Sequence, residues 1–224
     1  MRKLVIFLFV FFTSASLNSA NAVMPAALFG TAEIKAASLD ALPKWQTVMK
    51  KIDREQASYD ACRKNAAKCP SKAVAAWIAM LDSIKNKPQA VQVEKVNSFL
   101  NKWRYRTDSQ NYGRSDYWAS PVKFLARSGD CEDYAIAKYV SLRSVGFTVD
   151  QLRMVVVRDT IRDLNHAILA VYLDNDVVIL DNVTPSVRSQ DRVTNYAPYY
   201  SVNENARWAH VQPGKIILSL NTSR

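Results

Sequence analysis

A cysteine, a histidine and an aspartate in the second half of the chain provide the groups that thiol-based acyl chemistry needs. Cys131 follows Gly129-Asp130 at the expected start of a helix, where free amides and the helix dipole favour a thiolate and could donate to an oxyanion. His166 opens an expected strand, a rigid mount for a general base. Asp181 ends the next expected strand and could hold the imidazole tautomer. The three residues predict a nucleophile, a base and an orienting carboxylate.

Each of the first two residues also has a purely structural interpretation. Cys131 could be a small buried residue of a helix, which is common for cysteine. His166 could be a strand-end histidine whose ring hydrogen-bonds to backbone. His210 is the alternative base, although no carboxylate follows it in the sequence.

If Asp181 is to lie opposite His166, the turn of the hairpin between the two expected strands must have a particular position. A tight turn centred on Asn175 would pair Asp181 with Leu169 and not with His166. Direct opposition of the histidine and the aspartate needs a turn nearer residues 173–174, or a bulge. The triad therefore predicts an irregular hairpin.

The elements that must position these residues follow an order of helices first and strands later. Helices are predicted by apolar spacing and by start and stop residues at 44–59, 71–84, 89–103, 121–126 and 131–145. Strands are predicted by β-branched runs at 152–157, 166–173, 177–180 and 215–220. The stretch 107–121 is aromatic, polar and irregular. We expect an α+β fold with an antiparallel sheet, in which residues 23–104 are a helical part without strands and 105–224 form the core of one compact domain.

The N-terminus has the pattern of an export signal. Arg2 and Lys3 precede the apolar run Leu4 to Phe12, and the segment closes on Ala20-Asn21-Ala22, which resembles a cleavage site. The run is about half the length that spans a bilayer, so a permanent anchor is the weaker interpretation. We expect residues 1–22 to be cleaved, with no transmembrane segment in the mature chain.

Export changes the interpretation of the other two cysteines. Cys62 and Cys69 are seven residues apart, which in a continuous helix is roughly 10 Å and too far for a disulfide. Asn65 and Pro70 permit a break that would bring the two together. In an oxidising compartment we expect a disulfide, and the alternative is two separate buried thiols.

Composition and charge exclude several function classes. The chain has three Cys and two His among 224 residues, which nearly excludes zinc-finger, ferredoxin and multi-histidine sites, and it lacks both common glycine-rich phosphate motifs. The net charge is +10, and it is spread along the chain. This predicts either a solvated basic face or attraction to an acidic substrate or membrane surface, and we expect no nucleic-acid partner.

Four stretches taken together resemble the bacterial transglutaminase-like cysteine proteinases, and among them the periplasmic proteases that cleave surface adhesins. The stretches are Ser-Asp-Tyr-Trp-Ala-Ser-Pro (115–121), Gly-Asp-Cys-Glu-Asp-Tyr-Ala-Ile-Ala-Lys-Tyr (129–139), His166-Ala-Ile-Leu and Leu180-Asp181-Asn182. The resemblance covers roughly residues 95–210. It implies a papain-like, transglutaminase-like fold in which Cys131 is the nucleophile, His166 the base and Asp181 the orienting carboxylate.

The resemblance further implies calcium as a cofactor, with Asp130 and Glu132 as ligands. A cation would also neutralise two carboxylates that otherwise oppose a thiolate at Cys131. The alternative is that Asp130 is an N-cap and that Glu132 and Asp133 only favour the helix dipole. Two carboxylates cannot fill a calcium shell, so carbonyls, water, Asp133 or a loop residue must add to it.

The resemblance also implies partners and a role for Trp118. That residue could line the substrate groove or help bind the oxyanion, and the alternative is packing. The implied substrate is a large surface adhesin cut near its N-terminus, which releases cells from a biofilm, and the implied inhibitory partner is an inner-membrane cyclic di-GMP receptor. Two other functions remain open. One is a transglutaminase-type acyl transferase, and the other is a noncatalytic binding module on the same fold.

Overall fold

A single antiparallel sheet forms one layer of the molecule. The computed structural model describes residues 27–212, and within them seven strands lie in the order β1-β7-β6-β2-β3-β4-β5. The strands are β1 (Ala32–Ala36), β2 (Leu152–Asp159), β3 (Leu164–Leu173), β4 (Asp176–Leu180), β5 (Arg188–Ser189), β6 (Tyr196–Val202) and β7 (Arg207–Val211). Every pair of neighbours is antiparallel. Together with the helices described next, this confirms the expected α+β class.

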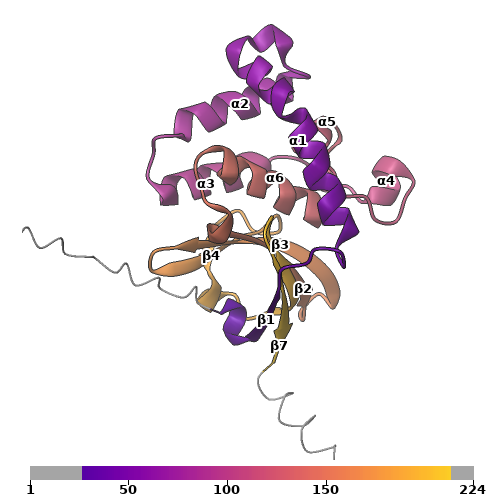
Figure 1. Ribbon diagram of the computed structural model, residues 1–224, viewed down its shortest axis with the longest axis vertical. Coiled ribbons are helices and arrows are strands. Elements are labelled where there is room, and N and C mark those ends of the chain that lie inside the picture. The colour runs from indigo at the N-terminus through magenta and orange to yellow at the C-terminus, as the bar shows by residue number, and fades with distance from the viewer. Residues whose placement is uncertain (1–26, 213–224) are drawn as a thin grey trace, which may run out of the picture.

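The helices form a second layer, gathered on one side of the sheet (Figure 1). They are α1 (Pro43–Lys64), α2 (Lys72–Ile84), α3 (Gln89–Leu100), α4 (Asp108–Tyr112), α5 (Pro121–Arg127) and α6 (Cys131–Ser144). The five helices predicted from the sequence are present, although α1 runs five residues beyond its predicted end at 59 and α3 stops three residues before 103. Helix α4 is an addition within the stretch expected to be irregular. None of the helices in the described part of the chain has the length and hydropathy that crossing a bilayer requires.

Helix α6 connects the two layers, because it packs both on other helices and on the sheet. Every residue from Asp133 to Leu142 is buried, because α6 packs on α3 and α5 and also on β2 and β3. A fully buried aliphatic side chain contributes about 1.5–3 kcal/mol, and this helix buries several, among them Ile136 and Leu142. The start of α6, and with it Cys131, is therefore held firmly against the sheet.

The expectation that residues 23–104 contain no strand is wrong for β1. This strand pairs with β7, with Ala32 opposite Val211 and Ala36 opposite Arg207. Its sequence, Ala-Glu-Ile-Lys-Ala, alternates apolar and polar residues over only five positions, and none of the five is fully buried. Strands β6 and β7 were not predicted either, whereas the predicted strand 215–220 and the export signal 1–22 lie outside the described residues.

The hairpin of β3 and β4 is regular, so the expectation of an irregular hairpin was also wrong. Leu173 pairs with Asp176 across a two-residue turn, and no bulge interrupts the register. Continued by one residue, that register sets Asp181 opposite Ile168, two residues from His166. Diagonal neighbours in a sheet are about 7–8 Å apart at the backbone, within reach of long side chains. The histidine and the aspartate meet diagonally.

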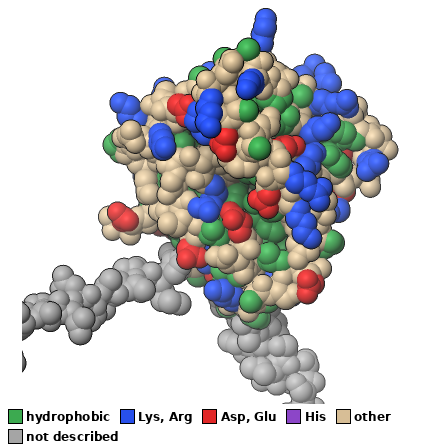
Figure 2. All heavy atoms as spheres, turned by 45° about the horizontal axis from the view of Figure 1, so that its top comes forward, with side chains coloured by type: hydrophobic (Ala, Val, Ile, Leu, Met, Phe, Trp, Pro, Cys, Tyr) green, Lys and Arg blue, Asp and Glu red, His purple; other side chains and the backbone are tan. Residues whose placement is uncertain are grey.

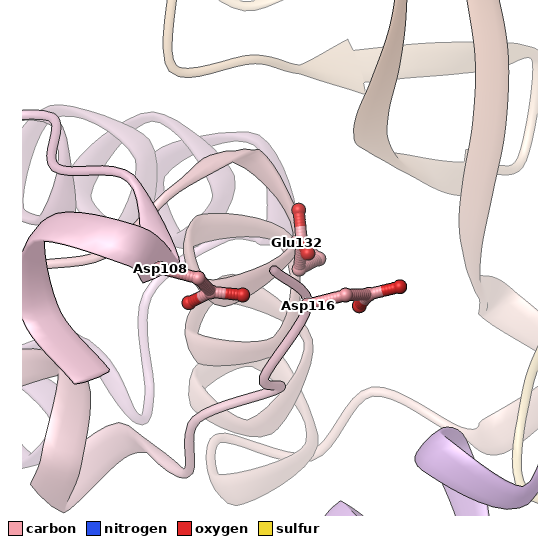
Figure 3. Close-up of side chains that lie close together, drawn as sticks. All are labelled: Asp108, Asp116 and Glu132. Carbon is pink, nitrogen blue, oxygen red and sulfur yellow. The ribbon is translucent and has the colours of Figure 1, made fainter. Parts of the chain in front are cut away.

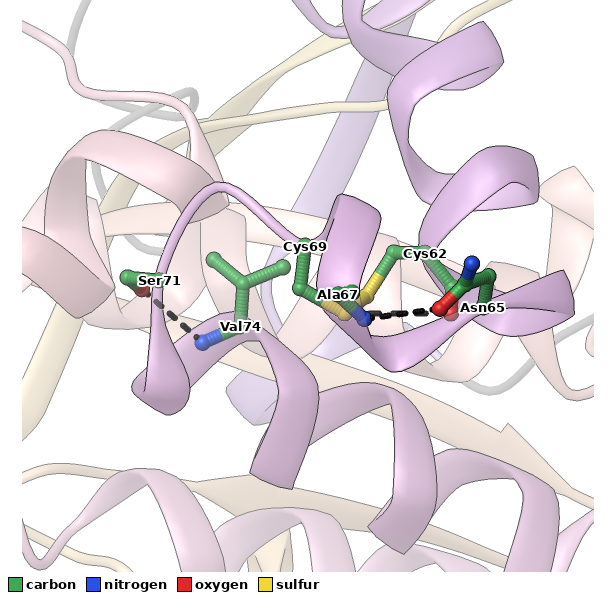
Figure 4. Close-up of a disulfide and its surroundings, with 6 residues drawn as sticks. All are labelled: Cys62, Asn65, Ala67, Cys69, Ser71 and Val74. Atoms are coloured by element: carbon green, nitrogen blue, oxygen red, sulfur yellow. Dashed lines mark hydrogen bonds between the residues drawn. A yellow bond between two sulfur atoms is a disulfide. The ribbon is translucent and has the colours of Figure 1, made fainter.

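Cys62 and Cys69 form a disulfide, as predicted. Helix α1 ends at Lys64, and the Asn65 side chain then accepts a hydrogen bond from Ala67 N at 2.9 Å. Figure 4 shows how this break turns the chain back so that the two cysteines meet. The disulfide joins the last turn of α1 to the segment that leads into α2.

Candidate active site

Cys131 begins α6 beside the strand that carries His166. The sulfur donates a hydrogen bond to Glu132 Oε2 at 3.2 Å, and the backbone N–H of Ala167 on that strand is close enough to act on the pKa of the thiol. Helix α5 ends at Arg127, and the next residue, Ser128, has a φ of 65°, in the left-handed region, so the chain turns there before α6 begins. Gly129 in this turn has no room for a side chain, because a Cβ there would collide with Asp133. The local sequence thus sets the thiol at the half-buried end of a buried helix.

His166 and Asp181 form a buried hydrogen-bonded pair. His166 Nε2 lies 2.8 Å from Asp181 Oδ1, and both side chains are almost fully buried. Tyr196 OH donates to Asp181 Oδ2 at 2.5 Å, and Val183 N donates to Oδ1 at 3.1 Å. Although burial opposes it, these donors lower the pKa of the Asp181 carboxyl. An ionised Asp181 accepts a hydrogen bond from Nε2–H, which leaves Nδ1 as the unprotonated nitrogen of the neutral ring.

Two asparagines of the α3 region hold the loop that follows Asp181. Asn101 Nδ2 donates to Asp181 O at 2.8 Å and to Thr184 O at 3.1 Å. One helical turn earlier, Asn97 Nδ2 donates to Pro185 O at 3.0 Å. Because the loop has no strand partner at this point, these bonds fix the backbone from which the carboxylate projects.

One cavity of about 190 Å³ opens onto the thiol and the imidazole. Its lining combines apolar and polar side chains: Asp116, Trp118, Cys131, Glu132, Met154, Val156, Asn165, His166, Ala167 and Tyr200. Trp118 lines this cavity and packs against the core, while its indole N–H donates to Asp116 Oδ1 at 3.0 Å. That bond occupies the donor that an oxyanion would need, so a place in the groove wall fits Trp118 better.

The surroundings of Cys131 oppose a resting thiolate. Burial raises the pKa of the thiol well above its usual range, and the negative charges and hydrogen bond from Glu132 and Asp130 add to the effect, which the Ala167 N–H opposes only in part. The expectation that the helix start lowers this pKa is therefore wrong for the protein alone. Burial, together with the carboxylates of Glu132 and Asp130, outweighs the helix dipole.

An acidic cluster surrounds the start of α6. Asp108, Asp116 and Glu132 have carboxylate oxygens within 4.8 Å of one another, and so do Asp108, Asp130 and Asp133. Figure 3 shows the first group coming together from α4, the loop after it and the first turn of α6. Oxygen-only ligands at this spacing suit a hard divalent cation.

Burial and mutual repulsion raise the pKa values of carboxyl groups in the acidic cluster. Burial and the nearby Glu132 raise the pKa of Asp130 to about 9, and burial raises that of Asp133 to about 8. Asp108 Oδ1, Asp130 Oδ1 and Asp133 Oδ2 are buried and have no hydrogen-bond partner in the part of the chain that the structure describes. Buried carboxylate oxygens without partners are costly, and a bound cation would satisfy them.

The structure brings into the acidic cluster two residues that the sequence did not point to. Asp108 and Asp116 come from the irregular stretch, and their only signal was a calcium shell left unfilled by Asp130 and Glu132. Although Asp130 occupies the N-cap position of α6, its side chain makes no capping bond.

His210, the alternative base, lies in a different place. Its Nδ1 lies 2.9 Å from Thr31 Oγ1 and its Nε2 lies 2.9 Å from Ser201 Oγ. Both ring nitrogens are therefore occupied, and His210 is not among the residues that line the cavity at Cys131.

Comparison with protein families finds a match over most of the chain. Residues 50–215 match the family described as bacterial transglutaminase-like cysteine proteinase, BTLCP. That range contains Cys131, His166, Asp181 and the whole acidic cluster. Comparison with curated proteins found no match.

Comparison with solved structures finds LapG of Legionella pneumophila. The calcium-bound form is 35% identical with a TM-score of 0.61, and the match covers 67% of this chain and 87% of that one. Another LapG structure is 33% identical with a TM-score of 0.61, covering 73% and 94% of the two chains. An EGTA-treated form is 32% identical with a TM-score of 0.60, covering 70% and 91%.

Proposed function

This chain belongs to the bacterial transglutaminase-like cysteine proteinases, and from that premise we propose that it is a calcium-dependent endopeptidase with Cys131, His166 and Asp181 as its triad. One observation carries the proposal. His166, which is hydrogen-bonded to the buried Asp181, and the free thiol of Cys131 line one cavity. This arrangement supplies a nucleophile, a base and an orienting group.

The proposed reaction begins with a protonated thiol. Cys131 Sγ attacks the scissile carbonyl carbon while its proton passes to His166 Nδ1, and the imidazolium then gives that proton to the leaving amine. Water hydrolyses the resulting thioester and regenerates the thiol. Asp181 stabilises the imidazolium and holds its orientation, and the free backbone N–H groups at the start of α6 are the proposed donors to the oxyanion.

Calcium is proposed to occupy the acidic cluster. Asp108, Asp116, Asp130, Glu132 and Asp133 supply the carboxylates, and three of their buried oxygens have no other partner among the described residues. The ion would supply positive charge that offsets these carboxylates beside the nucleophile. The calcium-bound LapG structure supports this part of the proposal.

The proposed substrate is a large surface adhesin, and the proposed compartment is the periplasm. The export pattern of residues 1–22 supports the compartment, and the disulfide of Cys62 and Cys69 suits an oxidising environment. Cleavage would release cells from a biofilm, and restraint by an inner-membrane cyclic di-GMP receptor stays a prediction from the family resemblance. The net charge of +10 suits an acidic substrate.

The experiment mixes the exported chain with the N-terminal fragment of the host's largest secreted adhesin, with calcium or with chelator. We expect one defined cut that requires calcium and disappears in Cys131→Ala. In Asp108→Asn the cut should need a higher calcium concentration, whereas Asp53→Asn, an exposed change on α1, should leave that concentration unchanged.

Three other outcomes would contradict parts of the proposal. A cut that survives chelation would remove the calcium requirement. A cut by Cys131→Ala would remove the nucleophile. Incorporation of an amine into a glutamine side chain, without peptide cleavage, would assign the triad to acyl transfer instead.

A further inference from the structure

A second cavity, which the proposed chemistry does not use, lies beside the active site. It has a volume of about 360 Å³ and is lined by Asn111, Tyr112, Arg114, Tyr117, Lys123 and Arg127. We call it the basic pocket. Three of its six lining side chains are cationic, and none is acidic.

The cations of the basic pocket have no acidic partner. Arg114, Lys123 and Arg127 are exposed, and none of them is in an ion pair within residues 27–212. Lys51 adds a fourth positive charge at Tyr117, where its Nζ donates to the hydroxyl at 3.0 Å. Figure 2 shows Lys and Arg side chains gathered on the side of the molecule where α4 lies. Like charges around one concavity repel one another, and an anion bound there would relieve the repulsion.

The pocket also has the geometry to bind a planar anion. The Arg127 guanidinium lies 5.9 Å from the centre of the Tyr112 ring, and that ring lies against Tyr117 with 4.4 Å between centroids. The two rings, tilted by 48° to one another, form an apolar wall next to a guanidinium. Guanidinium groups bind carboxylates through paired hydrogen bonds.

One short segment separates the basic pocket from the active-site cavity. Asp116 and Trp118 line the cavity at Cys131, whereas Tyr117 between them lines the basic pocket. On the other side of the pocket, Asn111 Nδ2 donates to Ser128 O at 3.1 Å, three residues before the thiol. An extended peptide advances about 3.3 Å per residue, so a substrate chain that leaves the active site over this segment reaches the pocket within a few residues.

We infer that the basic pocket is a second substrate-binding site, which takes an acidic side chain of the protein substrate a few residues from the scissile bond. The statement that the bound acidic side chain belongs to a protein substrate rests on the proposed function, whereas the statement that the pocket binds a carboxylate does not. The pocket would set the register of an acidic substrate segment in the cleft.

The first arm of the test measures binding without turnover. Full-length exported protein carrying Cys131→Ala is titrated with a fluorescein-labelled oligoglutamate peptide, and with an oligoglutamine peptide as the neutral match. We expect the acidic peptide alone to bind, more weakly as salt rises. Arg114→Gln, Lys123→Gln and Arg127→Gln should each weaken binding about threefold, and the triple variant by more than about tenfold.

The matched control removes the same number of positive charges at exposed positions outside the basic pocket. The triple variant Lys64→Gln, Lys87→Gln and Lys95→Gln alters three exposed residues outside the pocket and should keep the affinity within about twofold. Equal weakening in both triple variants would mean general charge attraction and would overturn the inference. Displacement of the peptide by inorganic phosphate more readily than by free glutamate would assign the pocket to phosphate and overturn it as well.

The second arm uses the cleavage reaction. Arg127→Gln should raise KM for the adhesin fragment and leave kcat unchanged, because the pocket contacts the substrate away from the reacting atoms. An unchanged KM would overturn the role in substrate binding. Failure of the wild-type protein to cleave counts against the proposed function alone, since the binding arm needs no turnover.

Discussion

At Cys131, burial and the neighbouring carboxylates act together to keep the sulfur protonated. A proteinase with such a thiol needs a base that removes the proton from sulfur and a positive charge that offsets the neighbouring carboxylates. His166 is suited to the first task because Asp181 holds its Nε2. The acidic cluster is suited to bind the cation that would perform the second.

The hydrogen bond from Tyr196 to Asp181 should contribute to catalysis through the imidazole. Tyr196→Phe removes one donor to a buried carboxylate, and such bonds to charged groups are worth about 1.5–3 kcal/mol. We expect kcat/KM to fall by about tenfold or more, with the pH profile displaced because Asp181 holds His166 less firmly. The measurement is the pH dependence of cleavage by the variant. Tyr199→Phe, an exposed neighbour on β6, is the control, and equal effects in the two variants would contradict the role.

At the scale of elements, α6 and the hairpin of β3 and β4 could be predicted from the sequence. Apolar spacing, the stop at Gly146 and the β-branched runs are local signals, and they place Cys131, His166 and Asp181 near the ends of their elements. The family resemblance, which rests on the same segments, is confirmed.

Other features could not be predicted because they depend on long-range contacts. β1 pairs with residues far away in the sequence, and the apolar–polar alternation of its five residues is too short to indicate that partner. Asp108 and Asp116 reach the start of α6 only because the irregular stretch folds back on it. The contact of His166 with Asp181 is diagonal across the two strands. It could not be predicted, because the sequence does not give the strand register and the prediction assumed that the two residues lie directly opposite each other.

The asparagine contacts from the α3 region predict a positioning effect on catalysis. Asn101→Ala removes the bonds to Asp181 O and Thr184 O, so the loop should hold the carboxylate less accurately. Small displacements of catalytic groups can cost up to about 100-fold, and we expect kcat to fall by about tenfold or more while KM changes little. Ser98→Ala, on the exposed side of α3, should not affect kcat. Unchanged kcat in Asn101→Ala, with the same unfolding temperature, would contradict this.

The disulfide should stabilise the helical layer without affecting the chemistry. It closes a loop with a sequence separation of seven, and the chain-entropy relation for that length gives about 2.4 kcal/mol. Urea denaturation of the double variant Cys62→Ser and Cys69→Ser should show a free energy of unfolding lower by about that amount. Its kcat at low temperature should equal that of wild type. A loss of kcat in fully folded variant would mean that the disulfide supports the active site.

At the scale of the whole molecule, His210 should make stability depend on pH. Burial lowers its pKa from the ordinary 6.5 to about 4, and Arg153 contributes, although Glu33 opposes the shift. The unfolded chain then binds more protons than the folded one between these values, so stability is complete above about pH 6.5 and declines as the pH falls toward 4. The unfolding temperature measured from pH 7.5 to pH 4.5 should fall less steeply in His210→Gln. Identical slopes in the two proteins would contradict the prediction.

The central claim is that Cys131 is a nucleophile made reactive by His166 and by a cation in the acidic cluster. The most direct test is the rate at which iodoacetamide alkylates the protein, followed by intact mass, at neutral pH with calcium and with chelator. With Cys62 and Cys69 in a disulfide, one alkyl group reports Cys131. We predict alkylation faster than that of free cysteine with calcium, and slow alkylation with chelator or in His166→Gln. A thiol that reacts slowly in every condition, and faster only at strongly alkaline pH, would contradict the claim.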